Sequence, residues 1–147
     1  MILLNKDFWN KRYITSNTGW DVGKITTPLK EYIDQINNKS IEILIPGCGN
    51  SYEAEYLFRN KFLSTFILDY SEEALRNFIK RVPEFSKNHL INSDFFDIQG
   101  KYDIIIEQTF FCAIDKSRRR EYFDKMYNLL KPNGKLVGLL FDDPLNE

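Results

Sequence analysis

Histidine and cysteine are scarce in this chain, which has one histidine, His89, and two cysteines, Cys48 and Cys112, among 147 residues. Zinc sites are built mainly from these two residue types, so the absence of a Cys/His cluster argues against a zinc centre. A Ser–His–Asp hydrolase would have to use His89, which lies at the start of a predicted strand, and that mechanism is disfavoured. Two cysteines do not form a disulfide framework, and the simplest interpretation is reduced, partly buried thiols in a cytoplasmic protein.

Long apolar runs and an excess of one charge sign are also missing. No apolar run reaches the length of a membrane-spanning helix, and the apolar stretch at residues 2–4 is too short for a signal peptide. A formal net charge of −1 argues against a nucleic-acid-binding surface. What is present is 43% hydrophobic and 15% aromatic residues, enough for one packed domain over residues 1–147. We therefore expect neither a nucleic acid nor a membrane as a partner.

Strand-like and helix-like segments alternate along the chain. Strands are expected at residues 41–45, 63–68, 89–92, 102–107 and 136–141, and helices at 7–14, 27–36, 51–60, 71–82 and 117–131. Such alternation predicts an α/β fold, in which a mostly parallel sheet carries helices on both faces. Ligands of such a fold bind across the carboxyl ends of the strands.

Three local details of the helices are also predicted. Thr27 is expected to cap the second helix, with Pro28 at its first position. Pro132-Asn133-Gly134 is expected to end the last helix. The buried side of that helix is expected to consist of Tyr122, Phe123, Met126, Tyr127 and Leu130.

A glycine turn follows the first predicted strand. Gly47 and Gly49 come directly after this apolar run, and Asp69 ends the next strand, about twenty residues on. Glycine lets a backbone approach a ligand without a Cβ in between, and a carboxylate at this place accepts from two ribose hydroxyls. The pattern therefore indicates a nucleotide-type cofactor site. A tight strand–helix turn with a surface acid is the structural alternative.

S-adenosylmethionine fits this pattern better than a nicotinamide dinucleotide. The dinucleotide motif needs a third glycine, and the bulky Tyr52 stands in its place. Asp94 and Phe95 follow the third strand, where they would clamp an adenine, whereas Phe96 is expected in the core. Three aromatic residues near the N-terminus would cover a sulfonium by cation–π attraction, or alternatively staple the first helix to the sheet. They are Trp9, Tyr13 and Trp20.

Six segments together resemble the thiopurine S-methyltransferase family, which includes thiol and halide methyltransferases. They are Phe8-Trp9-Asn10-Lys11-Arg12-Tyr13, Thr18-Gly19-Trp20-Asp21, Ile45-Pro46-Gly47-Cys48-Gly49, Leu68-Asp69-Tyr70-Ser71, Ser93-Asp94-Phe95-Phe96-Asp97 and Thr109-Phe110-Phe111-Cys112-Ala113-Ile114. The resemblance implies a Rossmann-like class I methyltransferase fold that uses S-adenosyl-L-methionine. The cofactor contacts it implies are Trp9, Tyr13, Trp20, Gly47, Asp69, Asp94, Phe95, Gln108 and Arg119. Arg118 and Arg120 are expected to lie on a solvated helix start.

The resemblance also carries an expectation about the end of the chain. Members of this family usually continue with two further strands, so the sheet is expected to lack its last two strands and to expose its fifth. A monomer is expected, with association through that exposed edge as the alternative.

The function implied is methyl transfer from S-adenosylmethionine to a small soft nucleophile such as a thiol, sulfide or halide. A non-catalytic cofactor-binding or interaction module and a nicotinamide-dependent oxidoreductase are the alternatives. No catalytic residue and no metal is assigned. Asp21 and Glu107 are candidates for a general base by position alone, and both cysteines are expected to be packing residues.

Overall fold

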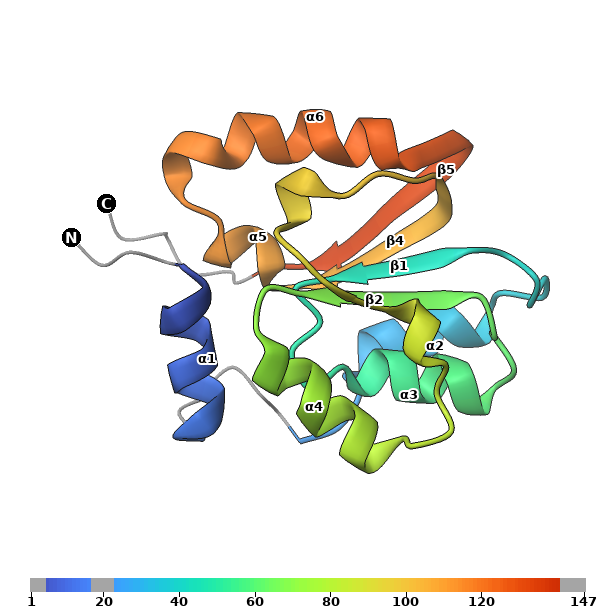
Figure 1. The fold of residues 1–147 in the computed structure, drawn as a ribbon. Coiled ribbons are helices and arrows are strands. Elements are labelled where there is room, and N and C mark those ends of the chain that lie inside the picture. Colours follow the sequence, from blue (N-terminus) through green and yellow to red (C-terminus); the bar gives the residue numbers. More distant parts are fainter. Residues whose placement is uncertain (1–4, 17–22, 141–147) are drawn as a thin grey trace.

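The chain forms a three-layer α/β arrangement (Figure 1). The structure, a computed structural model, describes residues 5–16 and 23–140. Its principal elements are α1 (Lys6–Ile14), α2 (Thr27–Asp34), β1 (Ile43–Pro46), α3 (Tyr52–Arg59), β2 (Thr65–Asp69), α4 (Glu72–Arg81), β3 (Leu90–Asn92), β4 (Tyr102–Gln108), α5 (Phe110–Ala113), α6 (Arg119–Leu129) and β5 (Leu130–Leu139). Three short 3-10 turns complete them, η1 (Lys87–His89), η2 (Phe95–Asp97) and η3 (Lys116–Arg118). Among the helices in these ranges, none has the length and apolar character needed to cross a membrane.

The five strands form one sheet in the order β3-β2-β1-β4-β5, and every neighbouring pair is parallel. Chain order reverses between β1 and β4, because the chain builds outward to β3 and then returns to the other side of β1. At such a switch point the loops after the two strands leave in opposite directions and open a crevice at the carboxyl ends. The sheet topology therefore places a ligand site beside the ends of β1 and β4.

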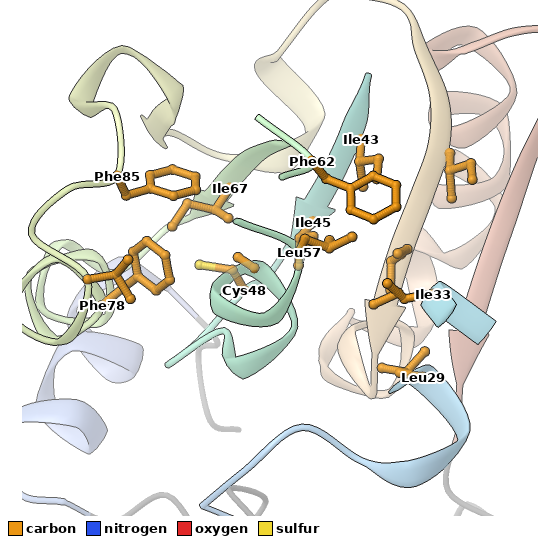
Figure 2. Close-up of a cluster of buried hydrophobic side chains, with 14 of the residues drawn as sticks. Leu29, Ile33, Ile43, Ile45, Cys48, Leu57, Phe62, Ile67, Phe78 and Phe85 are labelled. Carbon is orange, nitrogen blue, oxygen red and sulfur yellow. The ribbon is translucent and has the colours of Figure 1, made fainter. Parts of the chain in front are cut away.

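Two apolar cores cover the two faces of the sheet. Successive side chains of a strand point to opposite faces, so Ile43 and Ile45 enter one core while Leu44 enters the other. The first core packs the sheet against α2, α3 and α4, and Figure 2 shows it around Leu57 and Phe78. The second core packs the opposite face against α6. Burial on both faces explains why the strand sequences are almost continuously apolar.

Two expectations about helix α6 are wrong. Phe123 and Tyr127 are 55% and 81% exposed, whereas Tyr122, Met126 and Leu129 are buried. The buried residues are spaced at i, i+4 and i+7 and share one face, and the two exposed aromatics each lie one position further around the helix. The apolar residues of α6 therefore extend over a wider part of the helix surface than the face that is buried in the core.

Strand β5 begins six residues earlier than expected, directly after α6 and before the proline-containing turn. Between the pairs Tyr102–Leu130 and Ile104–Lys135, β5 advances five positions while β4 advances two. The extra residues form an irregularity in which Asn133 adopts φ +67°. Pro132-Asn133-Gly134 therefore lies inside a strand and does not end the helix, which already stops at Leu129.

The start of α2 also differs by one residue. Thr26 is the N-cap and its side chain makes no capping hydrogen bond, so Thr27 is the first residue of the helix. Pro28 still lies in the first turn, where its missing N–H costs nothing.

Candidate functional site

A cavity of about 370 Å³ opens at the carboxyl ends of β1, β2 and β4. It lies at the switch point of the sheet, where α/β folds bind their ligands. Of the nine residues predicted from the sequence to contact a cofactor, seven line it: Trp9, Tyr13, Gly47, Asp69, Asp94, Phe95 and Gln108. Arg119 is not among the lining residues, and Trp20 lies outside the described residues.

The loop between β1 and α3 is held in a left-handed conformation. Gly47 and Gly49 have φ values of +57° and +54°, and Ser51 has +48°. A Cβ built on Gly47 would lie 2.1 Å from Cδ2 of Phe110, a contact that no real side chain makes. The space beside Gly47 is therefore filled by the Phe110 ring. This glycine is required both by its dihedral angles and by the close approach of α5.

Asp69 closes this loop from the end of β2. Its Oδ2 accepts from the Gly49 N–H at 2.9 Å and its Oδ1 from the Ser71 N–H at 2.8 Å. The side chain is almost fully buried, and that burial raises the pKa of Asp69 to about 6, although the backbone N–H groups of Ser71, Gly49 and Tyr70 oppose the rise. A carboxylate has about four lone-pair positions, so it retains capacity for ligand hydroxyls. Asp69 thus has a structural role besides the one predicted from the sequence.

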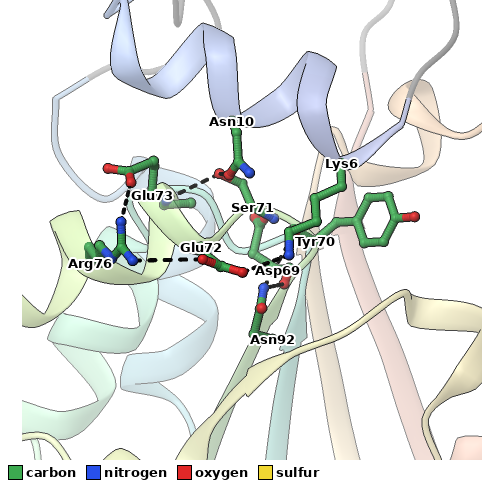
Figure 3. Close-up of polar contacts among 10 residues, drawn as sticks. Lys6, Asn10, Asp69, Tyr70, Ser71, Glu72, Glu73, Arg76 and Asn92 are labelled. Carbon is green, nitrogen blue, oxygen red and sulfur yellow. Dashed lines mark hydrogen bonds and ion pairs between the residues drawn. The ribbon is translucent and has the colours of Figure 1, made fainter.

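Ser71 connects this carboxylate to helix α1 (Figure 3). Its hydroxyl accepts from the Ala74 N–H at 3.3 Å, which caps α4, and donates to Oδ1 of Asn10 at 2.6 Å. Nearby, Lys6 Nζ lies 2.6 Å from Oε1 of Glu72. These two contacts tie α1 to the first turn of α4. They hold Trp9 and Tyr13 at the wall of the cavity.

Replacing Ser71 with alanine is expected to lower the free energy of unfolding by about 1–2 kcal/mol, because α4 loses its N-cap. Urea unfolding measures this change. Asn10→Ala is the matched control, since it breaks the tether to α1 and leaves the cap in place, and it is expected to cost less. Equal losses in the two variants would assign the effect to the tether and contradict the expectation.

The turn after β3 forms a second polar and aromatic wall. Oδ1 of Asp94 accepts from the Phe96 N–H at 2.9 Å and caps η2, and Asp94 also lines the cavity. Phe95 is 3% exposed and packs edge-on against Phe110, with ring centroids 5.3 Å apart. Phe96, expected in the core, packs against the second core, but it is only half-buried and also lines the cavity. The guanidinium carbon of Arg118 lies 3.8 Å from the centre of the Phe96 ring.

The three consecutive arginines at residues 118–120 differ in where their side chains lie. Arg118 lines the cavity, whereas the guanidinium of Arg119 packs over the Phe111 ring at 4.8 Å. The Nε atom of Arg119 is buried without a hydrogen-bond partner. The sequence analysis predicted Arg119 as a cofactor contact, whereas the arginine that lines the cavity is its neighbour Arg118.

Glu107 is not placed to act as a base in this cavity. It is 2% exposed, and its Oε1 accepts from the Tyr122 hydroxyl at 2.7 Å. Its Oε2 accepts from the N–H groups of Phe110 at 2.9 Å and Phe111 at 3.4 Å, which holds the start of α5. Burial raises the pKa of Glu107, and the hydrogen bonds oppose that rise. The other candidate base, Asp21, lies outside the described residues.

The two cysteines occupy different environments. Cys48 also lines the cavity but is buried in the first core, and burial, with Asp69 and Glu53 nearby, raises the pKa of its thiol well above the usual range. It is therefore an un-ionised packing residue, as expected. Cys112 is half-buried and lines the cavity, which agrees only in part with a packing role.

Several lining residues were not selected from the sequence as site residues. They include Lys24, Ser51, Glu53, Cys112 and Ile114. Cys112 and Ile114 belong to a segment that carries the family resemblance, so their place after β4 was a usable signal. Lys24 had no such signal, because it precedes α2 and follows no strand. Site residues that directly follow a strand can be predicted from the sequence. Site residues such as Lys24, which reach the same edge of the sheet from another segment, are harder to predict.

Comparison with known proteins gives a match over nearly the whole chain. The model of the thiopurine S-methyltransferase family matches residues 4–145. Probable thiol methyltransferase 2 of Arabidopsis thaliana is 30% identical over 144 residues, which cover 95% of this chain and 62% of that protein. Thiocyanate methyltransferase 1 of Brassica oleracea is 29% identical over 139 residues, which cover 90% of this chain and 61% of that protein. The chain therefore spans less than two thirds of the length of these relatives.

Solved structures of other proteins share the fold. The DhpI-SAM-HEP complex has a TM-score of 0.69 at 14% identity, covering 94% of this chain and 64% of that one. Magnesium protoporphyrin IX methyltransferase from Synechocystis with bound SAM also has a TM-score of 0.69 at 14% identity, covering 86% of this chain and 70% of that one. This similarity concerns the fold, and it confirms the predicted Rossmann-like α/β architecture of class I methyltransferases.

Proposed function

The chain belongs to the thiopurine S-methyltransferase family, and from that premise we propose that it transfers a methyl group from S-adenosylmethionine to a small soft nucleophile. Thiols, sulfide and halides are the acceptor class. The names of the relatives, thiol methyltransferase and thiocyanate methyltransferase, agree with a sulfur nucleophile. Under this proposal the chain acts on a small molecule, as a monomer in the cytoplasm.

The observation that carries the proposal is the chemistry of the groups around the cavity. S-adenosylmethionine presents a ribose diol, an adenine amine and a cationic sulfonium. Asp69 and Asp94 are acceptors for the diol and the amine, and the Trp9 and Tyr13 rings attract a cation. Oε1 of Gln108 is buried without a partner, which leaves an acceptor beside the end of β4. The residues present therefore fit this cofactor.

When bound, S-adenosylmethionine supplies the electrophilic methyl group. The residues of this chain bind and orient the two reactants and keep water away from them. Positioning of this kind lowers a barrier by about 7–11 kcal/mol in favourable cases. Glu107 is buried and does not line the cavity, so it is not placed to accept a proton from a nucleophile bound there. An acceptor that arrives already ionised, as a low-pKa thiol or a halide does, needs no such base.

A nicotinamide dinucleotide fits this loop less well. Tyr52 stands where a third glycine would allow a helix to approach a pyrophosphate. Its ring is covered by the guanidinium of Arg81, whose central carbon lies 4.5 Å from the ring centre. The start of α3 is therefore occupied by a packed aromatic side chain.

Calorimetric titration with S-adenosylhomocysteine tests the proposal, beside Asp94→Asn. Asparagine still accepts from the Phe96 N–H, so the cap of η2 is kept. The second carboxylate oxygen becomes an NH₂ donor, which opposes the donor amine of adenine. We expect micromolar binding by the wild type and about tenfold weaker binding by Asp94→Asn.

Asp97→Asn is the matched control, because Asp97 lies in the same turn, is exposed and does not line the cavity. It is expected to bind as the wild type does. A folded wild type that fails to bind S-adenosylhomocysteine, or that prefers reduced nicotinamide dinucleotide, would overturn the proposal. Binding without turnover of thiols or halides would support the non-catalytic module instead.

A further inference from the structure

Arg118 occupies a place in the cavity that the family resemblance did not assign. It is the last residue of η3 and directly precedes α6. Its guanidinium covers the Phe96 ring, with 3.8 Å between the guanidinium carbon and the ring centre. At that distance the planar guanidinium stacks on the ring face. Both residues also line the cavity.

Three carboxylates surround this cation. Arg118 Nη2 lies 3.0 Å from Oε2 of Glu121 in an exposed ion pair. The hydrogen bond that Arg118 donates to Glu121, together with the charges of Asp94 and Asp97, raises the pKa of Arg118. Glu121 lies on α6, and the two aspartates flank the Phe95-Phe96 turn. The guanidinium is therefore held over this turn by its ion pair with Glu121 and by its contact with the Phe96 ring.

The proposed adenine site is at the same place. Asp94, assigned above to the adenine amine, is one of the charges that act on Arg118. A guanidinium has two faces, so Arg118, which packs on the Phe96 ring and borders the cavity, can offer its second face to a planar ligand. Guanidinium planes stack on nucleobases as well as on aromatic side chains.

We propose that Arg118 binds the adenine of the cofactor by stacking, so that Phe96, the guanidinium and the purine form three layers, with Asp94 at the edge of the base. The inference rests on the proposed function, since it names the group that completes its adenine site. A single arginine would thereby link the turn after β3 to the start of α6 when the cofactor binds.

The neighbouring Arg120 provides a matched control, because it is exposed and does not line the cavity. Replacing it with alanine removes the same charge from the same segment without touching Phe96. Arg118→Lys keeps the charge but lacks the planar group, which separates stacking from charge.

The experiment is calorimetric titration of the wild type, Arg118→Ala, Arg118→Lys and Arg120→Ala with S-adenosylhomocysteine and with 5′-methylthioadenosine. The second ligand has the adenosine part but no amino-acid end. We expect Arg118→Ala to bind both ligands about fivefold more weakly, by the same factor. Arg118→Lys is expected to recover little of this loss, and Arg120→Ala is expected to bind within twofold of the wild type.

Three results would overturn the inference while the proposed function stands. They are wild-type affinity of Arg118→Ala for both ligands, full recovery by lysine, and a loss confined to S-adenosylhomocysteine. If Arg118→Ala raised only the KM of an anionic acceptor, Arg118 would belong to the acceptor site. Absence of binding by the folded wild type would instead reject the proposed function itself, together with this inference.

Discussion

Gly47→Ala is expected to abolish binding of S-adenosylhomocysteine and to lower the midpoint of thermal unfolding by about 10 °C. The left-handed φ of +57° costs a residue with a Cβ about 1–2 kcal/mol. The new Cβ would also lie 2.1 Å from the Phe110 ring, and relief of such overpacking typically costs a further 1–3 kcal/mol. For a chain of this size each kcal/mol corresponds to about 2–4 °C. Binding is lost because the loop must move away from the cavity to accommodate α5.

Gly23→Ala is the control that separates the backbone strain of a left-handed φ from the clash of a new Cβ with Phe110. Gly23 has φ +80°, and a Cβ built there meets no atom within 4 Å. This variant is expected to lose about 1 kcal/mol and to retain binding. The double variant Gly47→Ala/Phe110→Ala should be less destabilised than the sum of its parts, because removal of the ring frees the space. Calorimetry and thermal unfolding measure both effects, and simple additivity would contradict the contact with Phe110.

The role of Gly47 shows where sequence reasoning reached its limit. The glycine turn and its acid were recognisable because they are close in sequence and lie at strand ends. That Phe110 fills the space beside Gly47 is a contact between segments sixty-three positions apart, and no local pattern encodes it. The same holds for the arginines. Which of three consecutive residues reaches the cavity depends on where η3 gives way to α6.

The elements themselves were mostly predictable from hydrophobic pattern. The strands of the sheet interior are continuous apolar runs bounded by polar turns, and they form where expected. Errors arose where a pattern allowed more than one answer. On α6, apolar residues extend beyond the buried stripe, so Phe123 and Tyr127 had no signal to mark them as exposed. At the start of β5, Leu130 pairs with β4 before the proline and pairing resumes at Lys135, although a proline normally ends an element.

Asp69 is expected to make stability depend on pH in the opposite direction from an aspartate whose pKa is lowered by folding. Its pKa is raised from 3.8 to about 6 in the folded chain, chiefly by burial, so the folded state binds the proton more tightly than the unfolded state. The contribution of Asp69 to the free energy of unfolding is therefore complete below about pH 4. It is lost as the pH rises through 6. The whole difference corresponds to about 3 kcal/mol.

Urea unfolding of the wild type and Asp69→Asn at several pH values isolates this contribution, because the other titrating groups cancel in the difference. Asparagine has only one side-chain oxygen for the backbone N–H groups of Gly49 and Ser71. The free energy of unfolding of the variant is therefore lowered by an amount that does not change with pH. Relative to Asp69→Asn, the wild type is expected to lose about 2 kcal/mol between pH 4.5 and pH 7.5. A constant difference across this range would mean that the carboxylate keeps its ordinary pKa.

Cofactor binding should depend on pH in the opposite direction, because the ionised carboxylate is the better acceptor for ribose hydroxyls. Affinity of the wild type for S-adenosylhomocysteine should therefore fall by up to tenfold per pH unit below 6, and a pH-independent affinity would place the ribose elsewhere.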